Sequence, residues 1–441
     1  MVFEMRNIKH FQLSDIKVKV KHDTDCLMLY TWLSLFFILP FIRFILTRIG
    51  IETGLLREII IVIITSIPII LFMINLNKIK LSKYLWFFAL LFAVIILMII
   101  SVLLNPSLYE FYIRKSYGLD KILRPDSAIF IALFISVVDD NEKVFDILIK
   151  FAIIYFFYLI LVDLIPMLNR GYWVDIDPDG RMLKLDYNLS FGYNLTFPCI
   201  IFIYKFIICK KNFYIIPSLI SIYLILIYGN RGAMLVVFLY VFLILLRSLN
   251  KINLCKKIFI ILGTIIVFVI FEKFYDQLLM FLFRKINDYN IDSRSIRMMI
   301  NGKFAEDNGR DVIWRAVIDA IKSKPLLGYG ILGDRPFVEP IHYVGYSHNL
   351  FLEIIVSFGI IGYVIIFYLL KGSFNMIFKC DDRKSNDLFI VLFAVSCQLL
   401  ISMSFWYVWQ FWAAIGVYIN YQRNIKEKKT SMIIENNGDI G

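Results

Sequence analysis

The stretch YSHNLFLE (346–353) places a histidine and a glutamate at the start of a segment that is apolar enough to cross a membrane. A neutral imidazole can accept a proton near neutral pH, because the unperturbed pKa of histidine is about 6.5. If Ser347 caps the following helix, His348 lies in its first turn, where the helix dipole disfavours the charged imidazolium. We therefore interpret His348 as a candidate general base. The plainer alternative is an interfacial histidine that only hydrogen-bonds loop backbone.

Two arginines are candidates for binding an anionic group, because a guanidinium offers forked donors to phosphate oxygens. Arg231 stands in LIYGNRGAMLVV (226–237), in a short turn between two apolar runs. A charge there is costly unless it pairs or faces a wet cavity, although it could also snorkel to lipid phosphate. Arg310 begins RDVIWRAVIDAIKSKP (310–325), whose apolar residues recur at helical spacing. The plain interpretation of this amphipathic helix is a structural role on the membrane or across the mouth of a helix bundle.

Five further residues are weaker candidates for supporting roles in the site. Asp163 and Glu353 lie within apolar runs and could pair with the arginines or hold hydroxyl groups of a ligand. Three further supporting candidates are Asn349, Arg315 and Tyr329. The segment LLGYGILGDRP (326–336) could cradle phosphate, but its glycines more often serve sharp turns. The sequence shows no dedicated cation cage, so we expect no metal and no cofactor.

The composition defines the setting in which these residues act. Of the 441 residues, 60% are hydrophobic and 19% are charged, and the mean hydropathy is +0.74, which predicts an all-α polytopic membrane protein. The formal net charge of +12 would suggest nucleic acid in a soluble protein. In a membrane protein, however, Lys and Arg collect in cytoplasmic loops and face anionic lipid. We therefore expect membrane lipid as a partner and no nucleic acid.

Apolar runs long enough to span a membrane, about 17 to 25 residues each, predict about twelve transmembrane helices. They lie near 27–46, 57–76, 84–104, 122–138, 146–167, 188–208, 213–229, 231–247, 256–273, 348–370, 386–404 and 405–421. The last two share so tight a junction that one re-entrant hairpin is an alternative. The predicted organisation is a nine-span bundle (27–273), a large external loop (274–347) with an amphipathic helix at 310–324, and three further spans (348–421). The segments 1–26 and 422–441 are predicted tails.

The distribution of basic residues predicts the orientation. If the N-terminus is cytoplasmic, the inside segments include the basic stretches 77–83 and 209–212 as well as both tails. None of the six cysteines falls in a predicted external loop, where an oxidising compartment could pair them. We therefore expect both termini inside and the candidate residues on the external side.

Three elements together carry a family resemblance: GNRG (229–232), GRDVIWRAVIDAIKSKPLLGYG (309–330) and SHNLFLEIIVSFGIIG (347–362). In order, spacing and topological side they resemble the O-antigen ligase and Wzy-type polysaccharide polymerase superfamily of bacterial envelope glycosyltransferases. The resemblance covers about 188–365. It implies a GT-C-like architecture in the bacterial cytoplasmic (inner) membrane, with the active site facing the periplasm. The family's functional roles fall on Arg231, Arg310 and His348.

The resemblance also implies the chemistry. The donor would be a glycan attached through pyrophosphate to undecaprenol. His348 would take the proton of the attacking acceptor hydroxyl, while Arg231 and Arg310 would stabilise the departing pyrophosphate. No covalent nucleophile is evident in the sequence, so we expect direct displacement with inversion at the anomeric carbon.

Three functions remain open on the sequence alone. We favour a polymerase of O-antigen or capsule repeats, for which another lipid-linked repeat is the acceptor and a chain-length regulator protein would be a partner. The first alternative is an O-antigen ligase that transfers the glycan to lipid A core, as in lipopolysaccharide. The second is a flippase or other transporter, although transporters favour internal repeats and broken helices around a midplane site.

Overall fold

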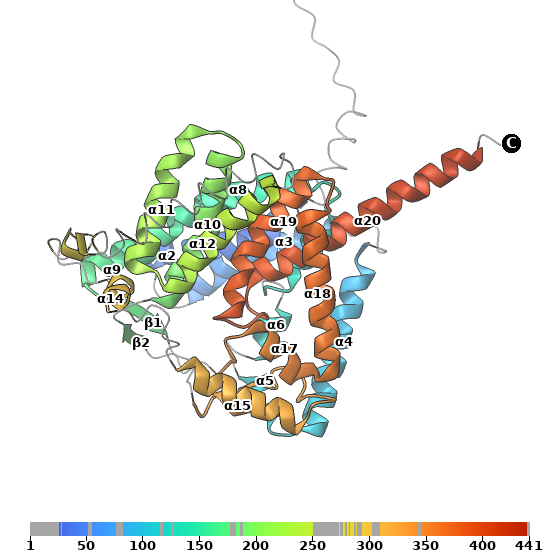
Figure 1. The fold of residues 1–441 in the computed structure, drawn as a ribbon, viewed down its shortest axis with the longest axis horizontal. Coiled ribbons are helices and arrows are strands. Elements are labelled where there is room, and N and C mark those ends of the chain that lie inside the picture. Colours follow the sequence, from blue (N-terminus) through green and yellow to red (C-terminus); the bar gives the residue numbers. More distant parts are fainter. Residues whose placement is uncertain are drawn as a thin grey trace, which may run out of the picture.

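The computed structural model describes residues 26–27, 29–51, 55–75, 83–114, 118–124, 127–176, 182–185, 188–249, 293–301, 309–341 and 345–438, together with isolated positions between 273 and 288. Helices dominate these residues (Figure 1). The prediction of an all-α class is therefore confirmed, apart from one short hairpin described below.

The elements before the predicted large loop are η1 (Ser34–Ile38), α2 (Leu39–Arg48), α3 (Leu55–Asn75), α4 (Leu85–Leu104), α5 (Leu108–Ile113), α6 (Leu119–Leu123), α7 (Phe130–Val137), α8 (Asn141–Tyr158), η4 (Leu159–Leu164), α9 (Ile165–Arg170), β1 (Trp173–Ile176), β2 (Met182–Leu185), α10 (Leu189–Ile207), η5 (Asn212–Tyr214), α11 (Ile215–Tyr228) and α12 (Arg231–Leu249). Those that follow are α14 (Arg294–Ile300), α15 (Arg310–Ser323), α16 (Arg335–Val338), α17 (Leu350–Phe358), α18 (Ile360–Phe378), α19 (Arg383–Ser396), η6 (Cys397–Leu400) and α20 (Trp409–Gly438).

Several helices are long and apolar enough to cross a membrane, as expected for a polytopic membrane protein. Within the described part of the chain there are six: Leu29–Arg48, Leu85–Leu104, Asn141–Arg170, Leu189–Ile207, Arg231–Ser248 and Ile360–Phe378. The predicted number of twelve spans is therefore not confirmed. The predicted span 256–273 lies almost wholly outside the described residues.

The core of the bundle is built around α10. This helix packs against α8, α11, α12 and α19, and its central residues are nearly all buried. Large apolar side chains on the outward faces of α4, α11, α12 and α18 are instead exposed, as on helices that face lipid. Helix α20 packs against α7 and α19 and then extends away from the body toward the C-terminus (Figure 1).

The predicted span 348–370 is not one helix but two, α17 and α18, with a break at Gly359. The φ angle of Gly359 is +57°, which favours glycine because it has no Cβ. A Cβ at this position would collide with the carbonyl of Leu326, and the N–H of Ile360 donates to that same carbonyl at 3.1 Å. The break is therefore filled by backbone from the Gly-rich segment.

Other predicted spans also differ from the structure. The run 122–138 divides between α6 and the eight-residue α7. The run 386–404 ends as a helix at Ser396, and α20 begins at Trp409, so an irregular segment separates the last two predicted spans. Hydropathy counts apolar residues and does not report where the backbone bends, which explains these differences.

A two-stranded hairpin, β1 and β2, occupies part of the predicted external loop 168–187. The strands pair antiparallel, and Trp173 packs its ring on Phe191 with centroids 4.9 Å apart. This hairpin corrects the purely helical prediction. Its four-residue strands carry too little alternation to be recognised in the sequence.

Helix α15 runs from Arg310 to Ser323, one residue short of the predicted 310–324. Its apolar stripe, Ile313 and Val317, is buried against α16 and α17. Figure 1 shows α15 lying across one end of the molecule beside α17. The apolar face of this amphipathic helix therefore packs against other helices of the protein.

Candidate active site

His348 lies just before α17 and not in its first turn. The N-cap is Asn349, whose Oδ1 accepts hydrogen bonds from the N–H groups of Phe351 (3.0 Å) and Leu352 (3.1 Å). The prediction that Ser347 caps the helix is therefore wrong. Asn caps helices about as well as Ser, because its side-chain oxygen likewise accepts from the free N–H groups of the first turn.

The backbone of His348 is strained. Its φ angle is +52°, a left-handed conformation that costs a non-glycine residue on the order of 1 kcal/mol or more. The side chain is only 6% exposed, and its ring packs on Tyr346 with centroids 4.4 Å apart. A strained and buried histidine in a loop is typical of a functional site.

Positive φ angles recur around this loop. Among the described residues, four that are not glycine have a positive φ, namely Lys210, Leu332, His348 and Met403. All but Lys210 belong to segments that surround one buried ionic cluster. Surrounding contacts must hold such conformations, because each is unfavourable in isolation.

The buried cluster is centred on Arg335, at the start of α16. Its guanidinium lies 3.0 Å from the carboxylate of Asp334 and 3.5 Å from Oε1 of Glu353. All three side chains are almost fully buried. Glu353 also accepts hydrogen bonds from the Ser404 hydroxyl and from the N–H of Phe405. Glu353 thus pairs with an arginine, but with one that the sequence analysis did not select.

Arg335 remains charged in this environment. Burial acts to lower its pKa, but Asp334, Tyr407 and Glu353 outweigh burial and raise the pKa above the ordinary arginine value. A permanently charged group in the interior is tolerated only when it is paired and hydrogen-bonded, as it is here.

The ionic cluster fixes the loop that carries His348. The N–H of Ser347 donates to Asp334 Oδ2 at 2.8 Å, and Arg335 donates to the carbonyl of Gly345 at 3.2 Å. The ring of Tyr346 lies under the guanidinium of Arg335, 5.4 Å from its centroid. Three successive residues before His348 are therefore held by two side chains of the cluster.

Helix α15 is tied to the same loop. The indole N–H of Trp314 donates to the carbonyl of Ser347 at 3.1 Å. Trp314 follows Arg310 by one turn of the helix, so this bond couples the position of Arg310 to that of His348.

Tyr193, on α10, links the two candidate arginines. Its side chain is 3% exposed and lies within electrostatic range of both Arg310 and Arg231. Its hydroxyl lies so close to Gly232 that a Cβ there would collide with it. Arg231 and Arg310 therefore lie within electrostatic range of the same tyrosine, although 78 residues separate them between positions 232 and 309.

The turn before α12 explains how Arg231 reaches this place. Asn230 caps the helix, because its Oδ1 accepts from the N–H of Ala233 at 2.9 Å while its Nδ2 donates to the carbonyl of Leu189 at 2.9 Å. A Cβ on Gly192 would lie 2.8 Å from the Cα of Gly229. The glycines therefore permit α10 to approach the turn closely and hold Arg231 at the helix start.

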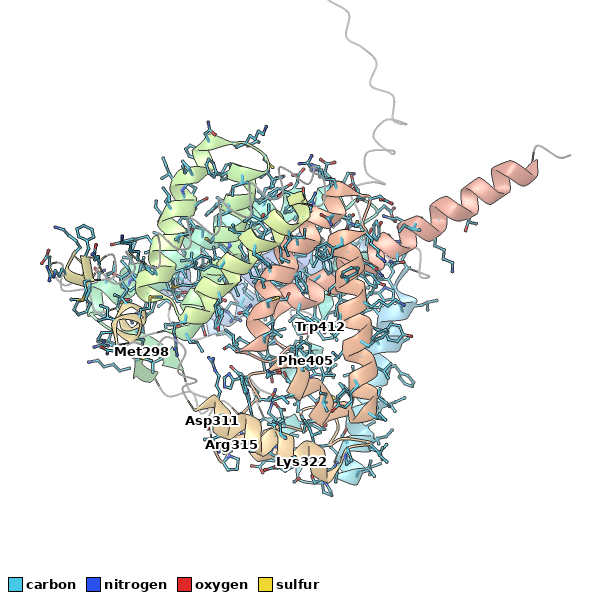
Figure 2. The ribbon with its side chains drawn as sticks, in the orientation of Figure 1. Met298, Asp311, Arg315, Lys322, Phe405 and Trp412 are labelled. Carbon is cyan, nitrogen blue, oxygen red and sulfur yellow. The ribbon has the colours of Figure 1, made fainter. Side chains whose placement is uncertain are left out.

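The other sequence candidates have different surroundings. Arg315 is 71% exposed and pairs with Asp311 on the outer face of α15, where Figure 2 labels both side chains. Tyr329 anchors the Gly-rich segment, since its N–H donates to the carbonyl of Val356 at 2.8 Å. This supports the turn interpretation of the glycines over a phosphate cradle. Asn349 serves as the helix cap described above.

Asp163 lies in the wall of a cavity of about 320 Å³ formed by the N-terminal part of the bundle. The cavity also contacts Arg43, Asn194 and Tyr407. It is thus distinct from the loop of His348, although Asn194 directly follows Tyr193 in the chain.

The sequence analysis missed Arg335, Asp334 and Trp314 as site residues. The sequence did contain a clue to Arg335, because the charged pair Asp334–Arg335 follows a run of glycine and apolar residues in LLGYGILGDRP (326–336). Among the described residues, no group of three or more His, Cys, Asp or Glu side chains is arranged to hold a metal ion.

The fold and these contacts define a polytopic membrane protein in which a buried ionic cluster supports the loop before α17. Residues 216–367 match the family model Wzy_C, described as O-Antigen ligase, so the chain carries an O-antigen ligase family domain over these residues. The resemblance inferred from the motifs is confirmed, and Arg231, Arg310 and His348 all lie inside the matched region. No curated protein and no solved structure matches the chain.

Proposed function

We propose that the protein is a glycosyltransferase that lengthens a lipid-linked polysaccharide at the external face of the bacterial inner membrane. The growing glycan would leave undecaprenyl pyrophosphate and join a sugar hydroxyl of another lipid-linked repeat. The family domain implies lipid-linked glycan substrates. The observation that supports the assignment to these residues is that Arg231 and Arg310 both lie within electrostatic range of Tyr193.

Each step of the proposed reaction uses a group of this chain. The acceptor oxygen attacks the anomeric carbon of the donor sugar, and the bond from that carbon to the pyrophosphate oxygen breaks. The hydroxyl proton passes to the imidazole of His348. The negative charge that develops on the leaving pyrophosphate is stabilised by Arg231 and Arg310. Displacement in one step inverts the anomeric configuration.

The sharpest test of His348 uses His348→Asn rather than alanine. Asn tolerates the left-handed conformation, so the fold should be retained while the proton acceptor is lost. We expect transfer by purified protein to fall by at least about 100-fold, the lower range for loss of a general base. Near-normal transfer by a folded variant would remove His348 from the mechanism.

Arg231→Lys and Arg310→Lys test the pyrophosphate assignment. A lysine keeps the charge but lacks the forked donors, so both variants should lose almost as much transfer as the alanine variants. Lys322→Arg, on the exposed face of α15, is the control and should leave transfer unchanged. Full activity of both lysine variants would contradict clamping of the pyrophosphate.

An O-antigen ligase is the second candidate, since the matched family model is described by that name. The two functions differ in the acceptor and are separated by a deletion strain. Loss of long surface chains with single repeats still attached indicates the polymerase. Loss of all attachment with accumulation of lipid-linked polymer indicates the ligase. Movement of lipid-linked sugar between leaflets without any transfer would indicate a transporter instead.

A further inference from the structure

The cavity beside Asp163 is lined by charged side chains from segments far apart in the chain. Arg43 comes from α2, Lys121 from α6, and Arg124 from the turn after α6. Asp163 is the acidic side chain in its wall. The lining therefore carries three basic groups against one acidic group.

Gathering these cations in a membrane protein has a cost. Arg43, Lys121 and Arg124 are exposed residues, and like charges around one cavity repel one another unless an anion lies between them. The cavity of about 320 Å³ is large enough to hold a phosphate with part of a sugar, by comparison with ordinary ligand pockets of about 300 to 1,000 Å³. The charge and the volume together indicate an anionic ligand.

The other residues that line the cavity have the aromatic and polar groups that bind a sugar. Tyr155 and Tyr158 also line the cavity, with parallel rings whose centroids are 5.9 Å apart. Asn194 and Ser127 add an amide and a hydroxyl. A wall of flat aromatic rings with a few polar groups combines apolar contact with hydrogen bonding, as binding a hydroxylated ring requires.

One contact and one sequence neighbour connect this cavity to the candidate active site. Tyr407, in the wall, forms a side-chain hydrogen bond with Arg335 of the buried ionic cluster. Asn194, also in the wall, follows Tyr193, which lies near both Arg231 and Arg310. The cavity is thus a compartment adjacent to the residues proposed to bind the donor.

None of its lining residues lies within 216–367, so the family domain does not account for this cavity. We propose that it binds the phosphate-bearing head of the acceptor glycolipid, with Arg43, Lys121 and Arg124 holding the phosphate oxygens. The inference rests on the proposed function, in which a second lipid-linked molecule must be held while the donor occupies Arg231 and Arg310.

The test separates donor from acceptor. The donor is a lipid-linked repeat whose acceptor hydroxyl has been removed, so it can only give its glycan. The acceptor is the same repeat on either a short polyprenyl pyrophosphate or a neutral alkyl chain of equal length. Wild-type protein should show a KM for the charged acceptor lower by at least about tenfold, as charge-assisted hydrogen bonds to phosphate require.

The double variant Arg43→Gln/Arg124→Gln should abolish that preference and leave the KM for the donor unchanged. Arg48→Gln is the matched control, because Arg48 lies on α2 but stacks on Phe44 away from the cavity. Retention of the charged-over-neutral preference in the double variant, or an equal rise in the donor KM, would overturn the proposal. Size-exclusion profiles establish that each variant is folded.

A binding measurement without donor keeps the inference separate from the proposed reaction. In Arg231→Gln protein, whose donor site is impaired, the radiolabelled charged acceptor should still bind. Adding Arg43→Gln and Arg124→Gln to that variant should abolish the binding. If wild-type protein binds this acceptor in the cavity but transfers nothing, the proposed function fails and the inference stands. If activity and binding respond instead to the fraction of anionic phospholipid in the vesicle, the cavity holds bulk lipid and the inference is wrong.

Discussion

Arg335 is the buried charge on which the shape of the His348 loop depends. It pairs with Asp334 and Glu353, and Asp334 in turn holds the backbone of Ser347. A buried ion pair adds little net stability over an apolar replacement, but loss of one partner leaves a charge without compensation. The cluster is therefore better explained as a device that fixes the loop than as a source of stability.

We predict that Arg335→Leu destabilises the protein by about 3 to 5 kcal/mol, because two buried carboxyl groups lose their cation. Thermal unfolding in detergent measures the loss. The control Arg315→Leu removes an exposed ion pair on α15 and should cost less than about 1 kcal/mol. Equal effects of the two variants would show that the cluster has no special role.

At the scale of elements, the segment that follows α15 contacts the break at Gly359 and so positions α15. The backbone of 326–330 fills the break, while Trp314 of the same region reaches the carbonyl of Ser347. Helix α15 is thus attached at one end to α17 and α18 and near its other end to the His348 loop. A shift of α15 would move Arg310 relative to His348.

Gly359→Ala should destabilise the protein by at least about 2 kcal/mol, because strain at φ +57° is added to a collision with backbone that cannot rotate away. The matched control is Gly50→Ala. Gly50 also has a positive φ, +86°, but a Cβ at that position would meet nothing within 4 Å. The losses in free energy of unfolding, measured by chemical denaturation, should differ between the two variants by the cost of the collision. Similar losses for both variants would contradict the packing role of Gly359.

Trp314→Phe tests the link from α15 to the loop. The substitution keeps an aromatic ring but removes the donor to Ser347, so stability should fall by only about 1 kcal/mol. Transfer should fall further, by about tenfold or more, since catalysis is sensitive to small displacements of reacting groups. Val312→Ala, on the exposed face of α15, should change neither quantity. A loss of transfer no larger than the loss of stability would argue against positioning.

At the scale of the whole molecule, the proposed function requires α15 and the His348 loop to lie on the external side. The distribution of basic residues predicts this orientation, with both termini in the cytoplasm. Figure 1 shows α15 at one end of the bundle, whereas the turn between α10 and α11 lies at the opposite end. The two segments are therefore suitable reporters of the two faces.

We predict opposite labelling of Lys322→Cys and Lys211→Cys in a background in which the native cysteines are replaced. Both positions are exposed, on α15 and before α11 respectively. A maleimide that cannot cross membranes should modify the first variant in intact spheroplasts and the second only after permeabilisation. The reverse pattern would place the candidate site in the cytoplasm and exclude the proposed reaction.

The membrane class, the position of most long helices, the helix at Arg310 and the family domain could all be predicted from the amino-acid sequence. These features are local: hydropathy, periodicity and short motifs act over tens of residues at most. Three features became visible only in the folded chain: Tyr193 lies within electrostatic range of Arg231 and Arg310, Arg335 supports the His348 loop, and the helix breaks at Gly359. Each of these depends on which distant segments pack together, and a buried side chain's partner is set by that packing rather than by its neighbours in the chain.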